Sequence, residues 1–156
     1  MGAFMGGLMW AAALAFSPAS GATAAVTTAS EAAVDAFQSA LAKGDTKAAA
    51  ALLTDDALIF EEGGAERSKA EYAAHHLPAD AEFARSIRMS PARRFGDQAN
   101  GMAWIATEGR MTGMYKGKHV DRITTESMVL RETAAGWKIV HIHWSSAAAP
   151  TQPHSH

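Results

Sequence analysis

The hydrophobic pattern changes near residue 82, and this change limits the possible folds more than any other feature of the chain. Before it, apolar residues recur at the three- and four-residue spacing of helices. From Glu82 onward they alternate with polar residues, as in strands with one buried face. The loops GDQANG, YKGKH and ETAAG divide this part into four segments. Such short links cannot hold the crossover that parallel neighbours need, so an antiparallel meander is predicted.

The alternation places the four predicted strands at residues 82–95, 101–114, 119–132 and 137–146. Pro91 lies inside the first of them and cannot donate a ladder hydrogen bond. We therefore expect a bulge or a bend at that position.

Capping residues predict two helices near the start of this domain. Thr28 and Glu31 have the spacing of a capping box, and the helix that they open ends at the pair Lys43-Gly44. Asp45 can cap a second, alanine-rich helix that runs to Leu53. The two helices would form a hairpin.

A short strand and a third helix are predicted between this hairpin and the meander. The strand covers residues 57–61 and is followed by a turn at Gly63-Gly64. Ser68 and Glu71 repeat the capping-box spacing, and the helix after them should end before Pro78. The element order predicts an α+β domain, a cone-shaped curved antiparallel sheet wrapped around three N-terminal helices. A ligand cavity is expected between sheet and helices.

The first 24 residues have the pattern of a secretory signal peptide. An apolar run at 4–16 is followed by the small-residue triplet at 22–24, and it is too short to cross a bilayer. No Lys or Arg precedes it, which leaves a short buried helix as the alternative. We expect cleavage near Ala24, a periplasmic or secreted protein without membrane anchoring, a domain at 25–147 and a disordered tail at 148–156.

Composition excludes several classes of function. The 156-residue chain has no cysteine, which removes cysteine metal sites and nucleophiles and leaves the fold to core packing. Its formal net charge is −2 with both signs interspersed, so no positive field is present to attract nucleic acid. No cofactor is predicted.

The segments ALAKGDTKAAAALLTDDALIFEEGG and GWKIVHIHWSS carry a family resemblance. The chain resembles the nuclear transport factor 2-like superfamily over residues 31–147, and it is most similar to the SnoaL-like branch and to the association domain of calcium/calmodulin-dependent kinase. That domain shares a final-strand pattern seen here in Trp137, His141 and His143. The resemblance implies the cystatin-like cone. It implies no single reaction, because the superfamily includes isomerases, dehydratases, cyclases, hydrolases, transport adaptors and oligomerisation hubs.

Turn lengths predict which polar residues share a face of the sheet. A four-residue loop at 133–136 would set Glu126 opposite His143. A three-residue loop at 116–118 would then place the polar residues of these strands on one face of the sheet: Glu108, Arg110, Arg122, Glu126, His141 and His143. A two-residue loop at 116–117 would instead break this cluster. We prefer the three-residue loop because it separates polar from apolar residues.

This polar face predicts acid/base chemistry on a small organic molecule. Glu126 would orient His143, a catalytic pair able to remove a proton beside a carbonyl group. Arg110 and Arg122 would hold an anionic or carbonyl-bearing ligand. Further ligand contacts are predicted from Glu108, His141, Phe37, Phe60 and Tyr72. Isomerase, cyclase or dehydratase activity would suit such a site.

Two alternatives remain open at this stage. A homodimer that forms through the sheet is expected in either case. In the first alternative, the same polar face lies outside the cone and stabilises this dimer, in a non-catalytic oligomerisation or accessory module. In the second, His141 and His143 bind a periplasmic metal ion, since two residues of strand separate them by roughly 6 to 7 Å. A third ligand could come from the third helix only if that helix covers this face, and because adjacent His75 and His76 diverge, at most one of them would point in. The family resemblance implies no metal at the final-strand histidines, so no metal site is predicted.

Overall fold

The first helix starts and ends as the sequence predicts. In the computed structural model, which describes residues 28–150, α1 (Ala29–Lys43) begins at a complete capping box. The Thr28 hydroxyl accepts from the Glu31 backbone N–H, and the Glu31 carboxylate accepts from the Thr28 backbone N–H. Gly44 ends the helix at φ 74°, where the absence of a Cβ atom removes the steric penalty.

The second helix is shorter than predicted because strand pairing begins earlier. Asp45 caps α2 (Thr46–Ala51) as expected, but β1 (Leu53–Glu61) starts four residues before the predicted position. Leu53 already pairs with Ile139 of the last strand, so a tertiary contact extends the strand toward the helix. A tight turn then leads to the short strand β2 (Gly64–Glu66), which pairs with β1.

A fourth helix occupies the region where the first long strand was expected to start. The third helix, α3 (Lys69–Ala74), opens at Ser68 as predicted. Pro78 then lies in the first turn of α4 (Leu77–Ser86), where its missing N–H costs no hydrogen bond. The expectation of a strand from residue 82, and of three helices, was therefore wrong in this respect.

Six strands form one curved, open sheet in the order β2-β1-β6-β5-β4-β3. The long strands are β3 (Ile87–Ala99), β4 (Met102–Tyr115), β5 (Lys118–Thr133) and β6 (Gly136–Ala148). They form the predicted antiparallel meander, and the register shift expected near Pro91 is present. β1 pairs with β6 in parallel, which places an early strand beside the last one.

The hairpin between β4 and β5 has the shorter of the two loops considered. Tyr115 pairs with Lys118, which leaves only Lys116 and Gly117 in the turn. Both have positive φ, 48° and 77°, as in the primed turns that join twisted strands. The three-residue loop was therefore wrong. The polar face that depended on it does not form.

The hairpin between β5 and β6 contains a bulge that the sequence did not reveal. Near the turn the pairing is as expected, with Glu132 opposite Trp137. The register then shifts by one residue at Val140, which has no partner in β5. Beyond this bulge, Glu126 lies opposite Trp144 instead of His143.

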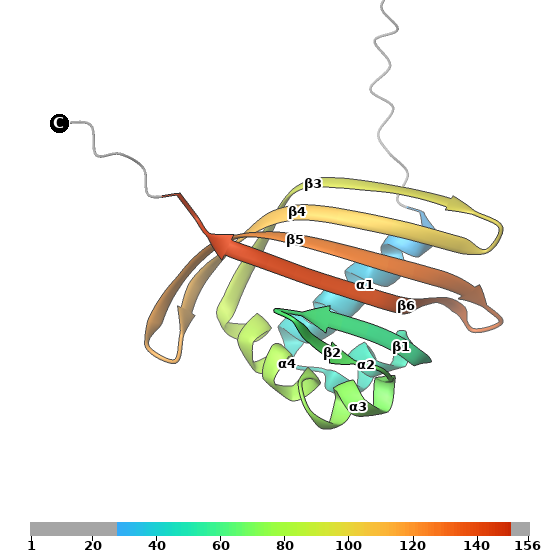
Figure 1. The fold of residues 1–156 in the computed structure, drawn as a ribbon, viewed down its shortest axis with the longest axis horizontal. Helices are drawn as coiled ribbons and strands as arrows, with labels where there is room; N and C mark the ends of the chain where they lie inside the picture. Colours follow the sequence, from blue (N-terminus) through green and yellow to red (C-terminus); the bar gives the residue numbers. More distant parts are fainter. Residues whose placement is uncertain (1–27, 151–156) are drawn as a thin grey trace, which may run out of the picture.

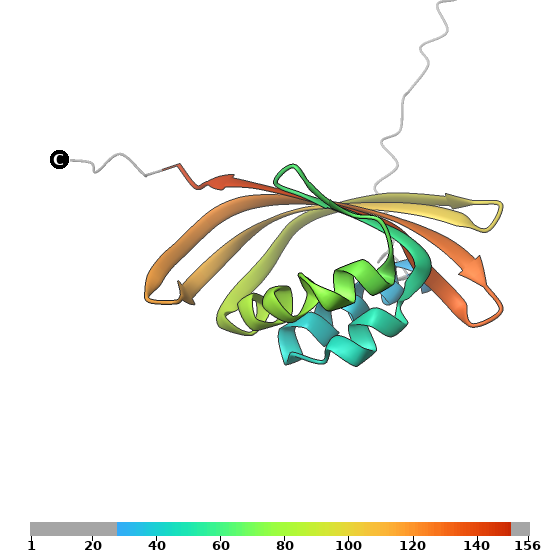
Figure 2. The ribbon, with the colours of Figure 1, turned by 60° about the horizontal axis from the view of Figure 1, so that its bottom comes forward.

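The helices cover one face of the sheet, which we call the inner face (Figures 1 and 2). The sheet arches over them, and the core lies between the two layers. Its largest fully buried side chains include Phe37, Tyr72, Leu77, Met128, Leu130 and Ile142. Among residues 28–150, no helix covers the opposite side of the sheet, which we call the outer face (Figure 2). An α+β cone is thus confirmed.

Two predictions concern chain ends that the structure does not describe. The signal segment at 1–24 lies outside the described residues, as do residues 151–156 of the predicted tail. Within residues 28–150, no helix is long and apolar enough to span a membrane.

Candidate functional site

A row of side chains crosses the inner face from one strand to the next. The register aligns Glu61 of β1 with Trp144 of β6, then Glu126 of β5, Thr107 of β4 and Arg94 of β3. Residues paired in this way project to the same side of a sheet. Two carboxyl groups therefore face the helices, with an indole ring between them.

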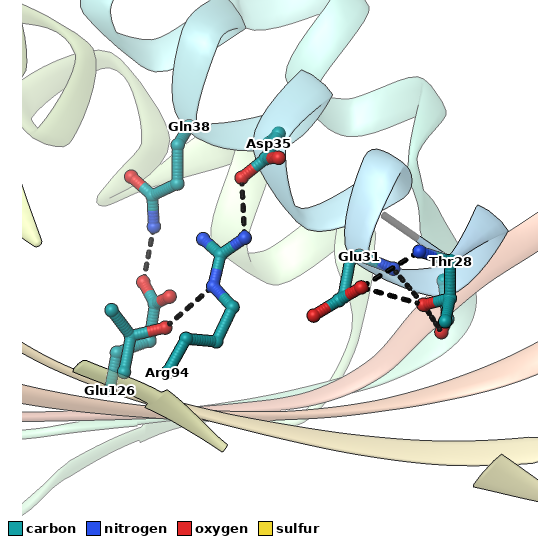
Figure 3. Close-up of polar contacts among 8 residues, drawn as sticks. Thr28, Glu31, Asp35, Gln38, Arg94 and Glu126 are labelled. Atoms are coloured by element: carbon teal, nitrogen blue, oxygen red, sulfur yellow. Dashed lines mark hydrogen bonds and ion pairs between the residues drawn. The ribbon is translucent and has the colours of Figure 1, made fainter. Parts of the chain in front are cut away.

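Glu126 is a buried carboxyl group that two donors hold from different elements. Its residue is 8% exposed. The Trp144 indole N–H donates to its Oε2 over 2.8 Å. The Gln38 amide of α1 donates to the same oxygen (Figure 3). Burial raises the pKa of Glu126 above its usual value, while the Trp144 hydrogen bond and the charge of Arg94 act in the opposite direction.

Arg94 connects β3, a strand at the edge of the sheet, to helix α1. Its guanidinium donates to the Asp35 carboxylate over 2.8 Å and to the Thr107 hydroxyl over 3.3 Å (Figure 3). Because Asp35 is already the counter-ion of the Arg94 guanidinium, we do not assign Arg94 to the binding of an anionic ligand. Its role next to Glu126 is structural.

Aromatic side chains fill the interior of the cone. The rings of Phe37 and Trp144 are stacked at 6.3 Å, and Tyr72 lies 6.5 Å from Trp144 between ring centroids. Phe37 and Tyr72 are fully buried. The interior therefore has little free volume beside Trp144. Open space lies instead beside the end of β1.

A cavity of about 330 Å³ opens between the end of β1, β2 and the third and fourth helices. Its lining residues are Ile59, Glu61, Glu62, Gly64, Glu66, Tyr72, His76 and Asp80. Four of these side chains are carboxylic acids and one is an imidazole. The cavity thus combines titratable groups with the volume of a small-molecule site.

Tyr72 and Asp80 form a hydrogen-bonded pair in the wall of this cavity. The Tyr72 hydroxyl donates to Oδ2 of Asp80 over 2.7 Å. Burial, followed by the nearby Asp80 charge, raises the pKa of Tyr72 far above its usual value, so the phenol stays protonated. Burial also raises the pKa of Asp80, while the bond from Tyr72 and the charge of His76 lower it.

Glu61 borders the cavity and titrates near neutrality. Desolvation, and to a lesser extent the charges of Asp80 and Glu62, together raise the pKa of Glu61 to about 7. Its side chain nevertheless keeps access to solvent. A carboxyl group of this kind can both accept and release a proton at physiological pH.

The rim of the cavity is held by a contact between β2 and the start of α4. His76 Nδ1 contacts Glu66 Oε1, and the Glu66 side chain is 8% exposed while that of His76 is 65% exposed. The imidazole therefore links a buried carboxylate to solvent. It is also the only cavity-lining side chain among the described residues that can become a cation.

A second, smaller cavity of about 160 Å³ lies at the start of α1. It is lined by Thr28, Ser30, Glu31, Gly96, Asp97, Gln98 and Ile105. Ser30 is buried there and donates to the Gln98 side chain over 3.0 Å. These polar groups already satisfy one another.

The structure divides the predicted polar cluster between the two faces. Arg122 alternates with Thr124 and Glu126 on the inner side, and the Arg122 guanidinium donates to Ser146. Glu108 and Arg110 lie on the outer face, where Arg93 and Asp121 pair with them at 3.1 and 2.6 Å. The prediction that these residues share one face was wrong because the turn between β4 and β5 is one residue shorter than expected.

The histidines also lie on the outer face, because of the bulge at Val140. His141 Nδ1 lies 2.9 Å from the Leu58 carbonyl oxygen. The Phe60 ring is nearly perpendicular to the rings of His141 and His143, with centroids 5.2 and 6.4 Å away. Ser127, not Glu126, is opposite His143. The predicted Glu126–His143 pair therefore does not form. Among residues 28–150, no group of three or more His, Asp or Glu side chains could hold a metal ion.

Of the predicted ligand contacts, the structure brings only Tyr72 to the cavity. Phe37 belongs to the buried interior, and Phe60 lies on the outer face. Sequence reasoning missed Glu61, Glu66, His76 and Asp80. One signal could have found Glu61: it follows buried Ala57 and Ile59 at alternate positions, so it faces the same side of β1.

Comparison with known proteins identifies relatives of this domain. Residues 31–150 match the model of the SnoaL-like domain family. A proposed ketosteroid isomerase from Shewanella frigidimarina has 34% sequence identity and a TM-score of 0.73, over 76% of this chain and 95% of that one. No curated protein matches the chain.

Two further solved structures share the fold at lower identity. A proposed dehydratase of the NTF2-like family from Streptomyces avermitilis has 18% identity and a TM-score of 0.61, over 76% of this chain and 93% of that one. A proposed calcium/calmodulin-dependent protein kinase II association domain from Xanthomonas campestris has 21% identity and the same TM-score, over 76% and 84%. Both support the cone architecture alone.

Glu61 should titrate near neutrality. We expect its side-chain carboxyl to titrate with a midpoint of about 7 in ¹³C NMR of glutamate-labelled protein. Asp80→Asn should lower this midpoint, because it removes the stronger of the two charges that oppose ionisation. Glu62→Gln should lower it less. A wild-type midpoint at the ordinary value of 4.5 would contradict the assignment.

Proposed function

The chain belongs to the SnoaL-like domain family, and from this premise we propose that it binds a small organic molecule in the cavity at the mouth of the cone. We further propose that Glu61 transfers a proton to and from this ligand. The single observation that carries the proposal is a carboxyl group with a pKa of about 7 at the edge of a cavity of about 330 Å³.

The charges around the cavity limit the class of ligand. Four carboxylic acids and one imidazole line it, so an anionic ligand would meet like charges. A neutral molecule with a carbonyl or hydroxyl group fits better. The volume is at the lower end of small-molecule pockets, which favours a ligand of about one ring.

The cavity contains the groups that a proton transfer next to a carbonyl needs. The Glu61 carboxylate would take a proton from the carbon beside the carbonyl group, and the electron pair would move to the carbonyl oxygen as an enolate. The His76 side chain also lines the cavity, and an imidazole N–H can donate a hydrogen bond to that oxygen. Asp80, fixed by Tyr72, raises the pKa of Glu61 and is a positioning residue. In a ligand whose enolate is conjugated with a carbon–carbon double bond, return of the proton to the far carbon of that double bond would complete an isomerisation.

The comparisons support this reaction class without identifying the substrate. The relative with 34% identity is described as a proposed ketosteroid isomerase. That name refers to chemistry in which a proton leaves a carbon atom. The present chain is proposed to carry out a reaction of the same class.

The proposal predicts slow proton exchange on a simple ketone. Wild-type protein in D₂O should accelerate hydrogen exchange beside the carbonyl of cyclohexanone, measured by proton NMR. Glu61→Gln should lower kcat/KM by about 10²-fold or more, the usual contribution of a general base. Because the carboxylate is the active form, kcat/KM should rise with pH and level off above about 7.

His143→Ala is the comparison variant for this assay. His143 lies on the outer face, so the exchange rate should equal that of the wild type, whereas the role first expected from the sequence requires a loss. Asp80→Asn should shift the pH midpoint downward while the protein still exchanges. Equal rates for wild type and Glu61→Gln would refute the proposed site.

We propose as a second function that the outer face forms a homodimer. Large apolar side chains remain exposed there, including Trp104 at 49%, Phe95 at 48% and Ile123 at 46%. Two ion pairs lie among them on the same face, Arg93 with Glu108 and Arg110 with Asp121. Two copies could bury the apolar side chains against each other while these charges stay paired.

Replacement of one apolar residue should separate this dimer. We expect wild-type protein to sediment as a dimer in analytical ultracentrifugation and Trp104→Asp to sediment as a monomer. Lys47→Asp, on the exposed side of α2, is the matched surface control and should remain dimeric. A monomeric wild type at concentrations near 100 µM, roughly the weak end of specific dimers, would refute the interface.

We also propose that the protein is exported. The support is the apolar run at 4–16 followed by the small-residue triplet that ends at Ala24. N-terminal sequencing of protein from the native host should give a mature chain that begins near Ala25. A chain that retains Met1 in the cytoplasmic fraction would overturn this proposal.

A further inference from the structure

The cavity at the end of β1 offers a ligand many hydrogen-bond acceptors and few donors. Four of the side chains that line it are carboxylic acids: Glu61, Glu62, Glu66 and Asp80. A carboxyl group that is ionised accepts hydrogen bonds through both oxygens and donates none. Among the lining residues that the structure describes, only Tyr72 and His76 add a side-chain donor of another kind.

Both of these donors already contact an acceptor in the cavity wall. The Tyr72 hydroxyl donates to Oδ2 of Asp80 over 2.7 Å. His76 Nδ1 contacts Oε1 of Glu66, whose side chain is 8% exposed. An imidazole has two ring nitrogens, so Nε2 of His76 is the one that remains for a ligand. The side chains of the wall therefore present one nitrogen and several carboxyl oxygens.

This imbalance determines which polar groups a bound ligand can carry. In the proposed reaction the carbonyl oxygen takes the His76 nitrogen as its donor, because negative charge develops on that oxygen. A second carbonyl or an ether oxygen would face carboxyl groups and lose its hydration without a replacement. A hydroxyl group can donate to a carboxylate, and hydrogen bonds to a charged acceptor are stronger than those between neutral groups.

Asp80 is an acceptor that the same ligand ring could reach. Its Oδ2 is held by Tyr72, which orients the carboxyl group and leaves Oδ1 for a ligand. The Asp80 backbone N–H donates to the His76 carbonyl oxygen over 2.9 Å, so the two residues lie one turn apart at the start of α4. Side chains at this spacing are about 5 to 6 Å apart between Cβ atoms, a separation that one six-membered ring can span.

We infer that the ligand of this site is a hydroxylated cyclic ketone, whose carbonyl oxygen lies at His76 and whose hydroxyl group donates to Asp80. The inference rests on the proposed function, because it concerns a ketone that reacts at Glu61. It makes Asp80 a specificity residue in addition to its effect on Glu61. A ketone without a hydroxyl group would displace water from the Asp80 carboxyl and give nothing back.

The test compares two ketones whose second oxygen differs in carrying a hydrogen. Proton exchange beside the carbonyl is measured for 4-hydroxycyclohexanone and 4-methoxycyclohexanone, and each kcat/KM is divided by the hydroxide-catalysed rate of that ketone. Wild-type protein should favour the hydroxy ketone by about tenfold or more. It should also favour it over the smaller cyclohexanone, which a purely steric effect of the methyl group would not produce. A wild-type ratio within about twofold of one would overturn the inference.

Asp80→Asn tests the contact itself. The amide replaces one acceptor oxygen with a donor of the same size, so the hydroxy-to-methoxy ratio should fall to within about twofold of one. Any change in the titration of Glu61 cancels in this ratio, because both ketones react at the same carboxyl group. If this variant does not unfold cooperatively on heating, Asp80→Ala takes its place with the same expected fall.

Glu82→Gln is the matched control, since it removes one carboxylate from the same helix. Glu82 does not line the cavity, so the ratio should stay at the wild-type value. A hydroxyl preference that persists in a folded Asp80 variant would refute the contact with Asp80. A preference lost equally in Glu82→Gln would refute it too, because net charge would then be the cause.

Failure of the proposed function would give a different result. Wild-type protein would then exchange neither ketone faster than Glu61→Gln. In that case saturation-transfer NMR gives the relative affinities of the hydroxy and methoxy ketones for wild type and Asp80→Asn. Stronger binding of the hydroxy ketone by wild type alone would still support the ligand class, and equal binding of both ketones would refute it.

Discussion

One unpaired residue in the last strand determines what faces the interior of this protein. Val140 has no partner in β5, so the side chains on either side of it shift by one position relative to a regular strand. Ile139 and Ile142 both become fully buried, and Trp144 reaches the inner face. His141 and His143 move to the outer face. The position of the indole, and with it the row of carboxyl groups, depends on this bulge.

The same row explains why carboxyl groups can stay in an apolar interior. Glu126 is retained because it accepts hydrogen bonds from Trp144 and Gln38, which lower the cost of burial. Glu61 lies at the edge, where solvent remains near but Asp80 and Glu62 oppose its ionisation. Desolvation is the leading cause of the raised pKa of both Glu61 and Glu126. Of these two residues, Glu61 lines the cavity and Glu126 does not. We therefore assign the proposed chemistry to Glu61.

Much of the fold could be predicted from local patterns. The capping box at Thr28 and the glycine at 44 define α1, because both act through contacts within a few residues. The meander follows from period and loop length. The fourth helix was missed because Pro78 was interpreted as an end, whereas a proline in the first turn is also compatible with a start. The candidate site was missed because its residues come from separate elements.

The sequence by itself determined the fold class, the antiparallel meander and the family resemblance, because these depend on periodicity, capping and short loops. Tertiary structure alone decided which residues meet. A turn shorter by one residue and one bulge exchange the two faces of a strand, since side chains alternate with a period of two. For this reason His143 and Glu126 lie on opposite faces, while Glu61, Tyr72 and Asp80, from three different elements, border one cavity.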